Sequence, residues 1–130
     1  MKSILLIVTA SLLTSTSQAA IYHLITASDL KQRLKNAYIY EPSLESEGFI
    51  HNATLTQVVP AANRHYQGKT DTLLLEIDET LLKFPLRYDY VERHNQYFPH
   101  IYGPINFSAV VKVFVMPVNS DGTYHLPGDL

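Results

Sequence analysis

The sequence predicts a single small α+β domain, because two amphipathic helical segments in its first half are followed by segments with mostly strand character. The chain of 130 residues is 46% hydrophobic and contains nine tyrosines and five phenylalanines, which is enough apolar surface for one core. It has no cysteine, so this core must form without disulfides. The same absence excludes a thiol nucleophile, a zinc ribbon and a lipid-modified cysteine.

Strands and helices alternate in the first half of the predicted domain. Residues 21–25 are apolar, β-branched and aromatic, which predicts a strand. Thr26 begins an S/T-x-x-D/E capping pattern, and the apolar residues after it recur at helical spacing, which predicts a helix over 27–36. A loop containing proline and glycine then leads into a short strand at 48–51.

A second helix is predicted after this strand. Thr54 and Gln57 repeat the capping pattern, and an apolar face extends from Leu55 to Tyr66. Pro60 either kinks this helix or marks its true beginning, because proline lacks the amide N–H that an interior helical residue donates.

The second half of the domain is predicted to be mostly strand, at 72–78, 86–91 and 109–116. We place the folded domain at 20–118 and a tail at 119–130. An Asp-Gly turn in the tail either forms a small hairpin or leaves the tail loosely attached.

Residues 1–19 are typical of a secretory signal peptide. One lysine precedes a ten-residue, largely apolar stretch from Ile4 to Leu13, and the small residues Ser17 and Ala19 precede the expected cleavage point. The stretch is shorter than the roughly 20 residues of a membrane span, so an uncleaved anchor is only the alternative. We expect a soluble exported domain, periplasmic or secreted, with nine basic and 12 acidic side chains and a net charge of −3.

Charge and motif spacing exclude several kinds of function. A mildly acidic chain without a Lys/Arg cluster is not expected to bind nucleic acids in general or anionic membranes. The six histidines are separated by 28, 14, 29, 6 and 25 residues, so none forms the close pair typical of zinc ligands. We predict no metal site from sequence, although distant loops could assemble one. The chain has neither a G-x-S-x-G nucleophile motif nor a Gly-rich phosphate loop.

Three histidines lie where the pattern favours apolar or aromatic residues. His23 interrupts the first strand, His51 ends the short strand GFIH, and His100 lies in the aromatic segment YFPHIYGPI. Each could simply satisfy its ring nitrogens against nearby backbone. If their strands are neighbours, however, all three converge on one cleft.

Other polar residues carry weaker signals. Arg64 and His65 are site candidates at the end of the second helix, where basic residues also complement the helix dipole. Glu47 is expected to be solvated in its loop, and His94 and His125 are expected to be surface residues.

Four motifs together resemble a bacterial family called domain of unknown function 952. They are IYHLIT, EPSLESEGFIHNAT, ANRHYQGKTDTLLLEID and FPHIYGPI, and the resemblance covers residues 21 to about 116. The family has no firmly established activity. Its fold is similar to that of ADP-ribosyltransferases and RNA 2′-phosphotransferases. This similarity implies a split, mixed β-sheet with two helices packed near the N-terminal half.

The same similarity implies residue roles in binding a nucleotide such as NAD. His23 with Thr26 resembles the histidine and hydroxyl pair that contacts the NAD ribose, and His51 resembles a histidine that contacts phosphate. His100 and Tyr102 lie in the late segment where ADP-ribosyltransferases carry a catalytic glutamate. That glutamate is missing here, which argues against mono-ADP-ribosylation.

The nearest alternatives to the missing glutamate are Glu76 and Glu92. From the resemblance and the residue pattern together, the predicted catalytic residues are His23, His51, His100 and Tyr102. The predicted nucleotide-binding residues are His23, Thr26, His51 and Arg64.

Two main hypotheses follow. The first is an exported domain that binds an NAD-like or phosphorylated nucleotide in a histidine-lined cleft, with ADP-ribosyl- or phospho-transfer as its reaction if it is an enzyme. Arg64 and protonated imidazoles would offset the phosphate charge. The alternative is a non-enzymatic binding or interaction module with FPHIYGP at its surface, which export favours because NAD is scarce outside the cytoplasm. A hydrolase with His23 or His51 as general base would need a nearby carboxylate.

Overall fold

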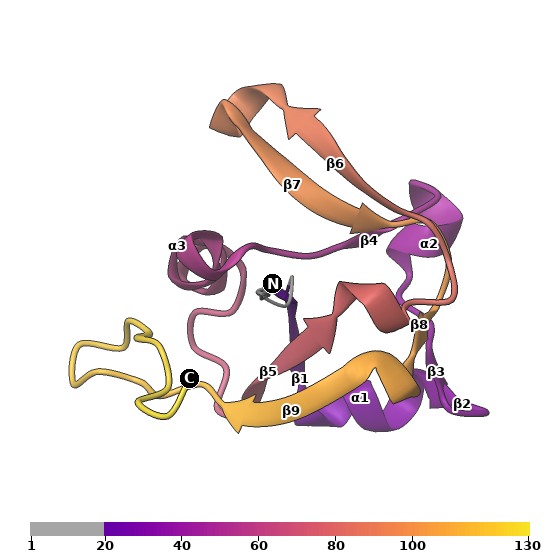
Figure 1. Ribbon diagram of the computed structural model, residues 1–130. Helices are drawn as coiled ribbons and strands as arrows, with labels where there is room; N and C mark the ends of the chain where they lie inside the picture. The colour runs from indigo at the N-terminus through magenta and orange to yellow at the C-terminus, as the bar shows by residue number, and fades with distance from the viewer. Residues whose placement is uncertain (1–19) are drawn as a thin grey trace, which may run out of the picture.

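Three small antiparallel sheets and three α-helices make up residues 20–130, the part of the chain that the computed structural model describes. The predicted signal peptide, residues 1–19, lies outside the described residues. In Figure 1 the sheet that contains the first strand lies at the bottom, and a β-hairpin rises at the top. Within residues 20–130, no helix has the length and apolar character to cross a bilayer.

The first sheet contains the longest apolar strands. Its strand order is β1 (Ala20–Thr26), β5 (Thr72–Asp78) and β9 (Val110–Val115), all antiparallel. The central strand β5 has a continuous apolar run, as expected for a strand that is covered on both faces. The strands predicted at 21–25, 72–78 and 109–116 are therefore confirmed within one or two residues.

The second sheet consists of three two-residue strands. Its order is β2 (Leu34–Lys35), β3 (Tyr38–Ile39) and β8 (Ile105–Asn106). Sequence analysis missed all three strands, because two residues are too few to show an alternating pattern.

Helix α1 (Ala27–Arg33) starts where the capping pattern predicted, with the Thr26 hydroxyl oxygen accepting from the Asp29 backbone N–H at 3.1 Å. It ends three residues before the predicted boundary at 36. The reason is tertiary: the chain turns sharply through Asn36 and Ala37, whose φ angles of 51° and 65° allow the next segment to pair as a strand.

The third sheet supports the rising hairpin. Its order is β4 (Ile50–His51), β7 (Gln96–Ile101) and β6 (Leu86–Val91). The hairpin consists of β6 and β7, joined by a 3₁₀ turn at Glu92–His94. The short strand predicted at 48–51 and the strand at 86–91 are both present, whereas β7 was read only as an aromatic segment.

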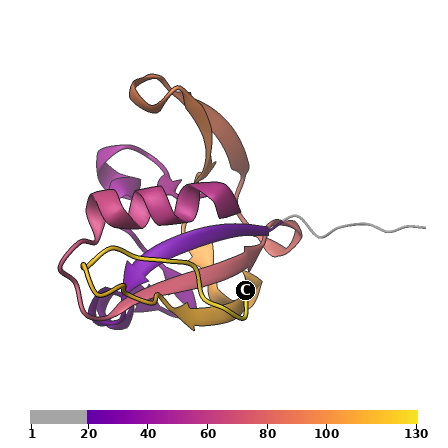
Figure 2. The ribbon, with the colours of Figure 1, turned by 90° about the vertical axis from the view of Figure 1, so that its left-hand side faces the viewer.

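Helix α3 (Leu55–His65) lies across β1, as Figure 2 shows. Pro60 is inside this helix, so it does not mark the beginning. Gln57 anchors the first turn: its side-chain oxygen accepts from the Thr54 backbone N–H, and its amide donates to the Tyr97 carbonyl at 2.8 Å. A further helix, α2 (Ser43–Ser46), is a single turn that the sequence pattern did not reveal.

The prediction of a mixed sheet is wrong. Every strand pair within residues 20–130 is antiparallel, and the strands form three separate three-stranded sheets. Paired strands run in opposite directions whether they are consecutive, as β6 and β7 are, or far apart in the chain, as β1 and β5 are. The α+β class and the two N-terminal-half helices are confirmed.

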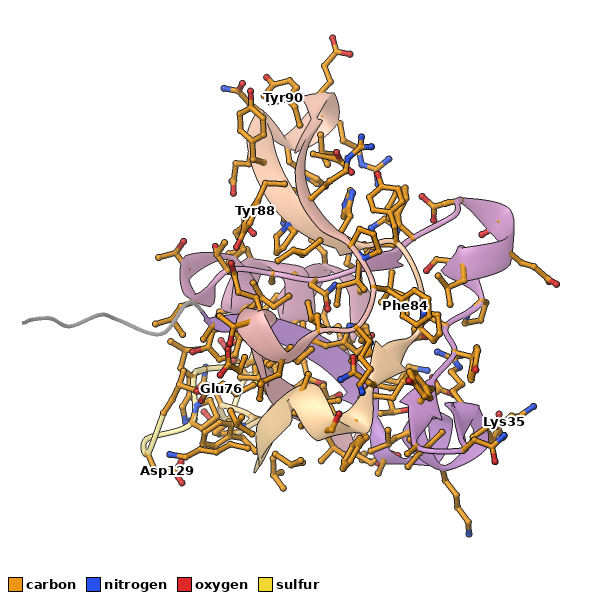
Figure 3. All side chains as sticks on the ribbon, turned by 45° about the vertical axis from the view of Figure 1, so that its right-hand side comes forward. Lys35, Glu76, Phe84, Tyr88, Tyr90 and Asp129 are labelled. Atoms are coloured by element: carbon orange, nitrogen blue, oxygen red, sulfur yellow. The ribbon has the colours of Figure 1, made fainter. Side chains whose placement is uncertain are left out.

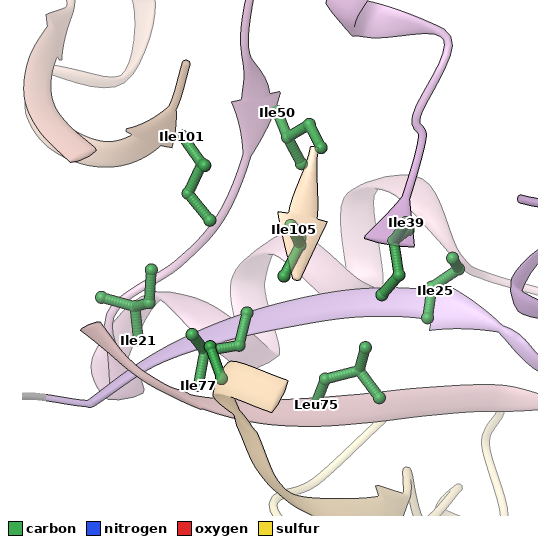
Figure 4. Close-up of a cluster of buried hydrophobic side chains, with 9 residues drawn as sticks. Ile21, Ile25, Ile39, Ile50, Leu75, Ile77, Ile101 and Ile105 are labelled. Carbon is green, nitrogen blue, oxygen red and sulfur yellow. The ribbon is translucent and has the colours of Figure 1, made fainter. Parts of the chain in front are cut away.

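Two buried clusters hold these layers together. The first, shown in Figure 4, is rich in isoleucine and joins all three sheets. Its members are Ile21, Ile25, Ile39, Ile50, Leu75, Ile77, Ile101, Ile105 and Ala109. The second lies between the first sheet and α3, and includes Tyr124 from the tail, which is 3% exposed. The Tyr124 hydroxyl hydrogen-bonds to the Tyr66 carbonyl and to Thr72, so the tail is packed onto the domain.

Replacing Leu75 by alanine is expected to lower the free energy of unfolding by about 2–5 kcal/mol, because this fully buried side chain would leave a cavity in the isoleucine-rich cluster. The matched control is Leu81→Ala, since Leu81 is 47% exposed, and its effect should stay within about 0.5 kcal/mol. Urea unfolding measures both. Equal losses for the two variants would contradict this account of the core.

Candidate functional site: a histidine-lined cationic cleft

The short strand β4 brings the three candidate histidines together. On one side, His51 of β4 pairs with His100 of β7. On the other, Ala53 exchanges two backbone hydrogen bonds of 2.8 Å with Tyr22 of β1, next to His23. The condition for convergence, that these strands are neighbours, is therefore met, although neither backbone contact shows in the sequence.

A cleft of about 370 Å³ opens at this junction, between β1, β4, the end of α3 and the β6–β7 hairpin. This volume falls in the range of about 300–1,000 Å³ that is typical of small-molecule sites. Its polar lining is strongly basic in type. It includes five of the six histidines (His23, His51, His65, His94 and His100), two arginines (Arg64 and Arg93) and one carboxylate (Glu41), beside the neutral Ser43, Asn52 and Tyr66.

Two of the predicted site residues do not reach the cleft. Thr26 is buried beneath the start of α1, where its hydroxyl caps the helix. Tyr102 lies beyond His100, and its hydroxyl donates to Asp89. Neither lines the cleft, because the turn into α1 and the end of β7 carry them away from it.

Two residues that sequence reasoning did not assign to a site do line it. His94, which was expected at the surface, and Arg93 lie in the turn of the β6–β7 hairpin and face the end of α3 across the cleft. His94 was read as a loop residue, and Arg93 was not singled out from the sequence. No local signal places a hairpin tip against a helix, so only the tertiary structure could identify them.

Both ring nitrogens of His23 are engaged by acceptors. Nδ1 lies 3.0 Å from the His51 carbonyl and 3.0 Å from the Asn52 side-chain oxygen, and Nε2 lies 2.7 Å from a Glu41 oxygen. The Asn52 amide donates to the Ile50 carbonyl, which fixes its oxygen toward His23. A ring that donates at both nitrogens satisfies all these contacts. Because neither nitrogen is left for a ligand, His23 organises the cleft rather than acting as a free base.

Glu41 is held as a carboxylate by its partners. Burial raises its pKa, but the hydrogen bond and positive charge of His23, together with the Arg33 guanidinium, outweigh burial and hold the pKa below its ordinary value of 4.5. The single acidic side chain in the lining is therefore already compensated by two cations.

His51 and His100 also have carboxylate partners. The His51 Nε2 lies 2.9 Å from Glu47, in a pair whose side chains are about half exposed. The His100 Nδ1 donates to Asp89 at 2.9 Å. Glu47, expected to be merely solvated, thus contacts a cleft histidine, and sequence analysis did not single out Asp89 at all.

The remaining cations of the cleft have no acidic partners. Within residues 20–130, neither Arg64 nor Arg93 forms an ion pair. Their charges act on the neighbouring imidazoles: partial burial, Arg64 and Arg93 together hold the pKa of His65 and of His94 below the ordinary 6.5. The cleft therefore disfavours further positive charge until an anion enters.

Despite its histidines, the cleft does not have the geometry of a metal centre. Among the residues from 20 to 130, no group of three or more His, Asp or Glu side chains is arranged to hold a metal ion. The two proposed replacements for a catalytic glutamate also lie elsewhere. Glu76 is on β5 opposite Tyr22, and Glu92 is exposed in the hairpin turn.

The prediction that FPHIYGP forms an aromatic surface is wrong for its first half. Phe98, Pro99, His100 and Ile101 are buried because β7 is covered by β4 and the cleft residues. The most exposed aromatic side chains belong instead to the hairpin, where Figure 3 shows Tyr88 and Tyr90. The alternating pattern of LRYDYV indicates that Tyr88 and Tyr90 are exposed together, because alternate residues of a strand lie on one face.

The sequence of this α+β domain matches a known protein family. Residues 24–113 match the family described as "Protein of unknown function (DUF952)", so the chain belongs to that family. No curated protein matches the sequence.

Solved structures with the same fold come from Caulobacter crescentus. The chain is similar to the crystal structure of its protein CC0527, with a TM-score of 0.73 and 21% identity over 82% of this chain and 94% of that one. The solution NMR structure of CC0527 gives a TM-score of 0.64 at 22% identity, covering 85% and 96% of the two chains. At this identity the likeness shows the fold alone.

Replacing Glu41 by glutamine is expected to lower the free energy of unfolding at pH 7 by about 3 kcal/mol, since His23 and Arg33 lose a buried partner. Because the pKa of Glu41 is lower in the folded chain, its contribution is complete above the ordinary pKa of 4.5. It is lost as the pH falls through the folded value. The difference between wild type and variant should therefore shrink below about pH 4.5 in urea titrations.

Glu47→Gln is the control, because its pair with His51 is half exposed and should contribute less than about 1 kcal/mol. A Glu41→Gln effect no larger than the control would show that the His23 junction does not stabilise the fold.

Proposed function

We propose that this protein binds a phosphorylated, nucleotide-like ligand of the NAD or ADP-ribose type in the histidine-lined cleft. The observation that carries the proposal is the charge of the lining: Arg64 and Arg93 face the cleft without ion-pair partners among the described residues, and its only carboxylate is compensated by His23 and Arg33. Arginine binds phosphate through paired N–H donors. A basic cleft in an acidic protein selects anions that the rest of the surface repels.

The aromatic residues that line the cleft support the same class of ligand. Phe98 and Tyr66 contribute aromatic surface beside the charged groups, which suits a ligand with a flat apolar part and a phosphate. The resemblance to ADP-ribosyltransferase-like folds, in which NAD is bound without a Gly-rich loop, favours this interpretation.

Binding is the part of the proposal that the residues support best. Transfer of an ADP-ribosyl group would need a free carboxylate near the ribose, and Glu41, the single carboxylate lining the cleft within residues 20–130, is already paired twice. Phosphotransfer chemistry, which relies on cations and histidine, fits the lining better. We also propose that the protein acts outside the cytoplasm, since its first 19 residues have the pattern of a signal peptide.

ADP-ribose or NAD at 1 mM is expected to stabilise residues 20–130 by about 1.4 kcal/mol if the Kd is about 0.1 mM, measured by thermal shift and calorimetry. Arg64→Ala and Arg93→Ala should each weaken binding about tenfold, because each removes charge-assisted hydrogen bonds to phosphate. Lys35→Ala is the control, since it also removes one positive charge but lies on β2, outside the cleft (Figure 3). Absence of stabilisation by either ligand would contradict the proposal.

Binding of ADP-ribose is expected to strengthen as the pH falls from 8 to 6. The pKa values of His65 and His94 lie below 6.5 in the free protein because of burial and the nearby arginines, and a bound pyrophosphate would raise them. Binding then takes up protons, which gives at most about a tenfold gain in affinity per pH unit for each proton. The phosphates of ADP-ribose stay ionised throughout this range.

Calorimetric titrations at pH 6, 7 and 8 measure this dependence. The double variant His65→Gln/His94→Gln should flatten it, whereas His125→Gln, at an exposed position outside the cleft, should leave it unchanged. Affinity that rises with pH would rule out proton uptake by these imidazoles.

The second candidate function is a binding module without catalysis, favoured by the exposed tyrosines of the hairpin. Tyr88, Tyr90 and Tyr97 are 46%, 50% and 61% exposed. Tyrosine rings on a projecting hairpin are suited to contact with a protein or a cell-wall polymer. This function is compatible with an occupied cleft, since the two features use different parts of the hairpin.

A further inference from the structure

His100 differs from the other cleft histidines because one of its ring nitrogens is buried without a protein partner. The side chain is 3% exposed, yet Nε2 forms no hydrogen bond. Among the described residues, it is the single buried side-chain nitrogen or oxygen atom in this condition. Native structures rarely retain such an atom, because its desolvation is not compensated, so it calls for an explanation.

The partner of the other nitrogen determines what Nε2 can do. Nδ1 lies 2.9 Å from Asp89, and the same carboxylate oxygen also accepts a hydrogen bond from the Tyr102 hydroxyl. The Tyr102 hydrogen bond lowers the pKa of Asp89, with His100 and Arg87 acting in the same direction, so Asp89 is ionised and only accepts. The His100 proton must therefore be on Nδ1.

Burial determines the charge of the His100 ring. It lowers the pKa of His100 even though Asp89 acts in the opposite direction, so the ring is neutral near pH 7. A neutral ring with its proton on Nδ1 presents a bare lone pair at Nε2, which accepts hydrogen bonds and does not donate them.

The ring is also held in one orientation. Phe49 stacks on it with ring centroids 4.0 Å apart and an angle of 17°, and the His51 ring meets it edge-on at 5.2 Å. The backbone is fixed by the pairing of β4 with β7. The ring is thus preoriented, and His100 lines the same cleft as Arg64 and Arg93.

We infer that Nε2 of His100 is the acceptor that recognises a hydroxyl or N–H donor of the ligand, while Asp89 acts as a positioning residue that keeps Nε2 free of a proton. This inference rests on the proposed function and narrows its ligand class. The ligand carries both a phosphate for the cleft arginines and a donor group, such as a sugar hydroxyl. A compound that presents only phosphate would leave Nε2 unpaired.

Nitrogen-15 NMR of the histidine rings in the unliganded protein tests directly which ring nitrogen of His100 carries the proton. At pH 7.5, His100 should show a protonated Nδ1 and an unprotonated Nε2. Asp89→Asn should shift the tautomer toward protonated Nε2, because the asparagine amide can donate to Nδ1. Asp129→Asn, at an exposed position near the C-terminus, should leave the spectrum unchanged (Figure 3). A wild-type ring protonated at Nε2 would overturn the inference whatever the protein binds.

Calorimetry with ADP-ribose and inorganic pyrophosphate tests whether Nε2 of His100 recognises a donor group of the ligand. His100→Phe keeps an aromatic ring against Phe49 but removes the acceptor, so ADP-ribose should bind at least tenfold more weakly while pyrophosphate affinity stays within twofold of wild type. Asp89→Asn should give the same selective loss with a melting temperature close to that of wild type, which keeps the test valid if His100→Phe folds poorly.

The two proposals fail differently. Equal affinity of the wild type and both variants for ADP-ribose would overturn the role of His100 and leave the anion-binding function standing. Failure of the wild type to bind either probe would contradict the proposed function and this inference together.

Discussion

The fold of this protein depends on the junction at which His23 joins three segments of chain. Its ring hydrogen-bonds to the His51 carbonyl, the Asn52 side chain and Glu41, and Glu41 in turn binds Arg33 of α1. The adjacent pair of backbone hydrogen bonds between Tyr22 and Ala53 attaches β4 to the first sheet. Without this junction, the third sheet would have no hydrogen-bonded connection to β1. The same network lines the cleft through His23, Glu41 and Asn52.

The histidines of the cleft have separate physical roles, although their residue type is the same. His23 has a structural role, since both of its ring nitrogens are hydrogen-bonded within the protein. Partial burial and the neighbouring arginines, which have no ion-pair partners among the described residues, lower the pKa values of His65 and His94. His100 is neutral and fixed by Asp89, which leaves one acceptor atom. In the proposed function, charge recognition and hydrogen-bond recognition therefore belong to different side chains within one cavity.

Sequence reasoning succeeded where the signal is local. Capping at Thr26 and Thr54 placed both long helices, and β-branched runs placed β1, β5 and β9. It failed for strands of two residues and for β7, where pairing with two neighbours overrides an irregular, proline-containing pattern. Similarly, an unusual position in an apolar segment singled out His23, His51 and His100. Arg93 and Asp89 lie in ordinary positions of a hairpin, so nothing local marks them.

The sequence by itself determined the α+β class, the main helices and strands, the family, and the histidines that meet at β4, because these follow from periodicity, capping and motif content. Only the tertiary structure decided which histidines are free, which carboxylates hold them and which cations face the cavity. Those properties depend on distances between residues far apart in the chain, such as Arg93 of the hairpin turn and Arg64 of α3. A protonation state or a hydrogen-bond partner is set by these distances, and the order of residues along the chain does not encode them locally.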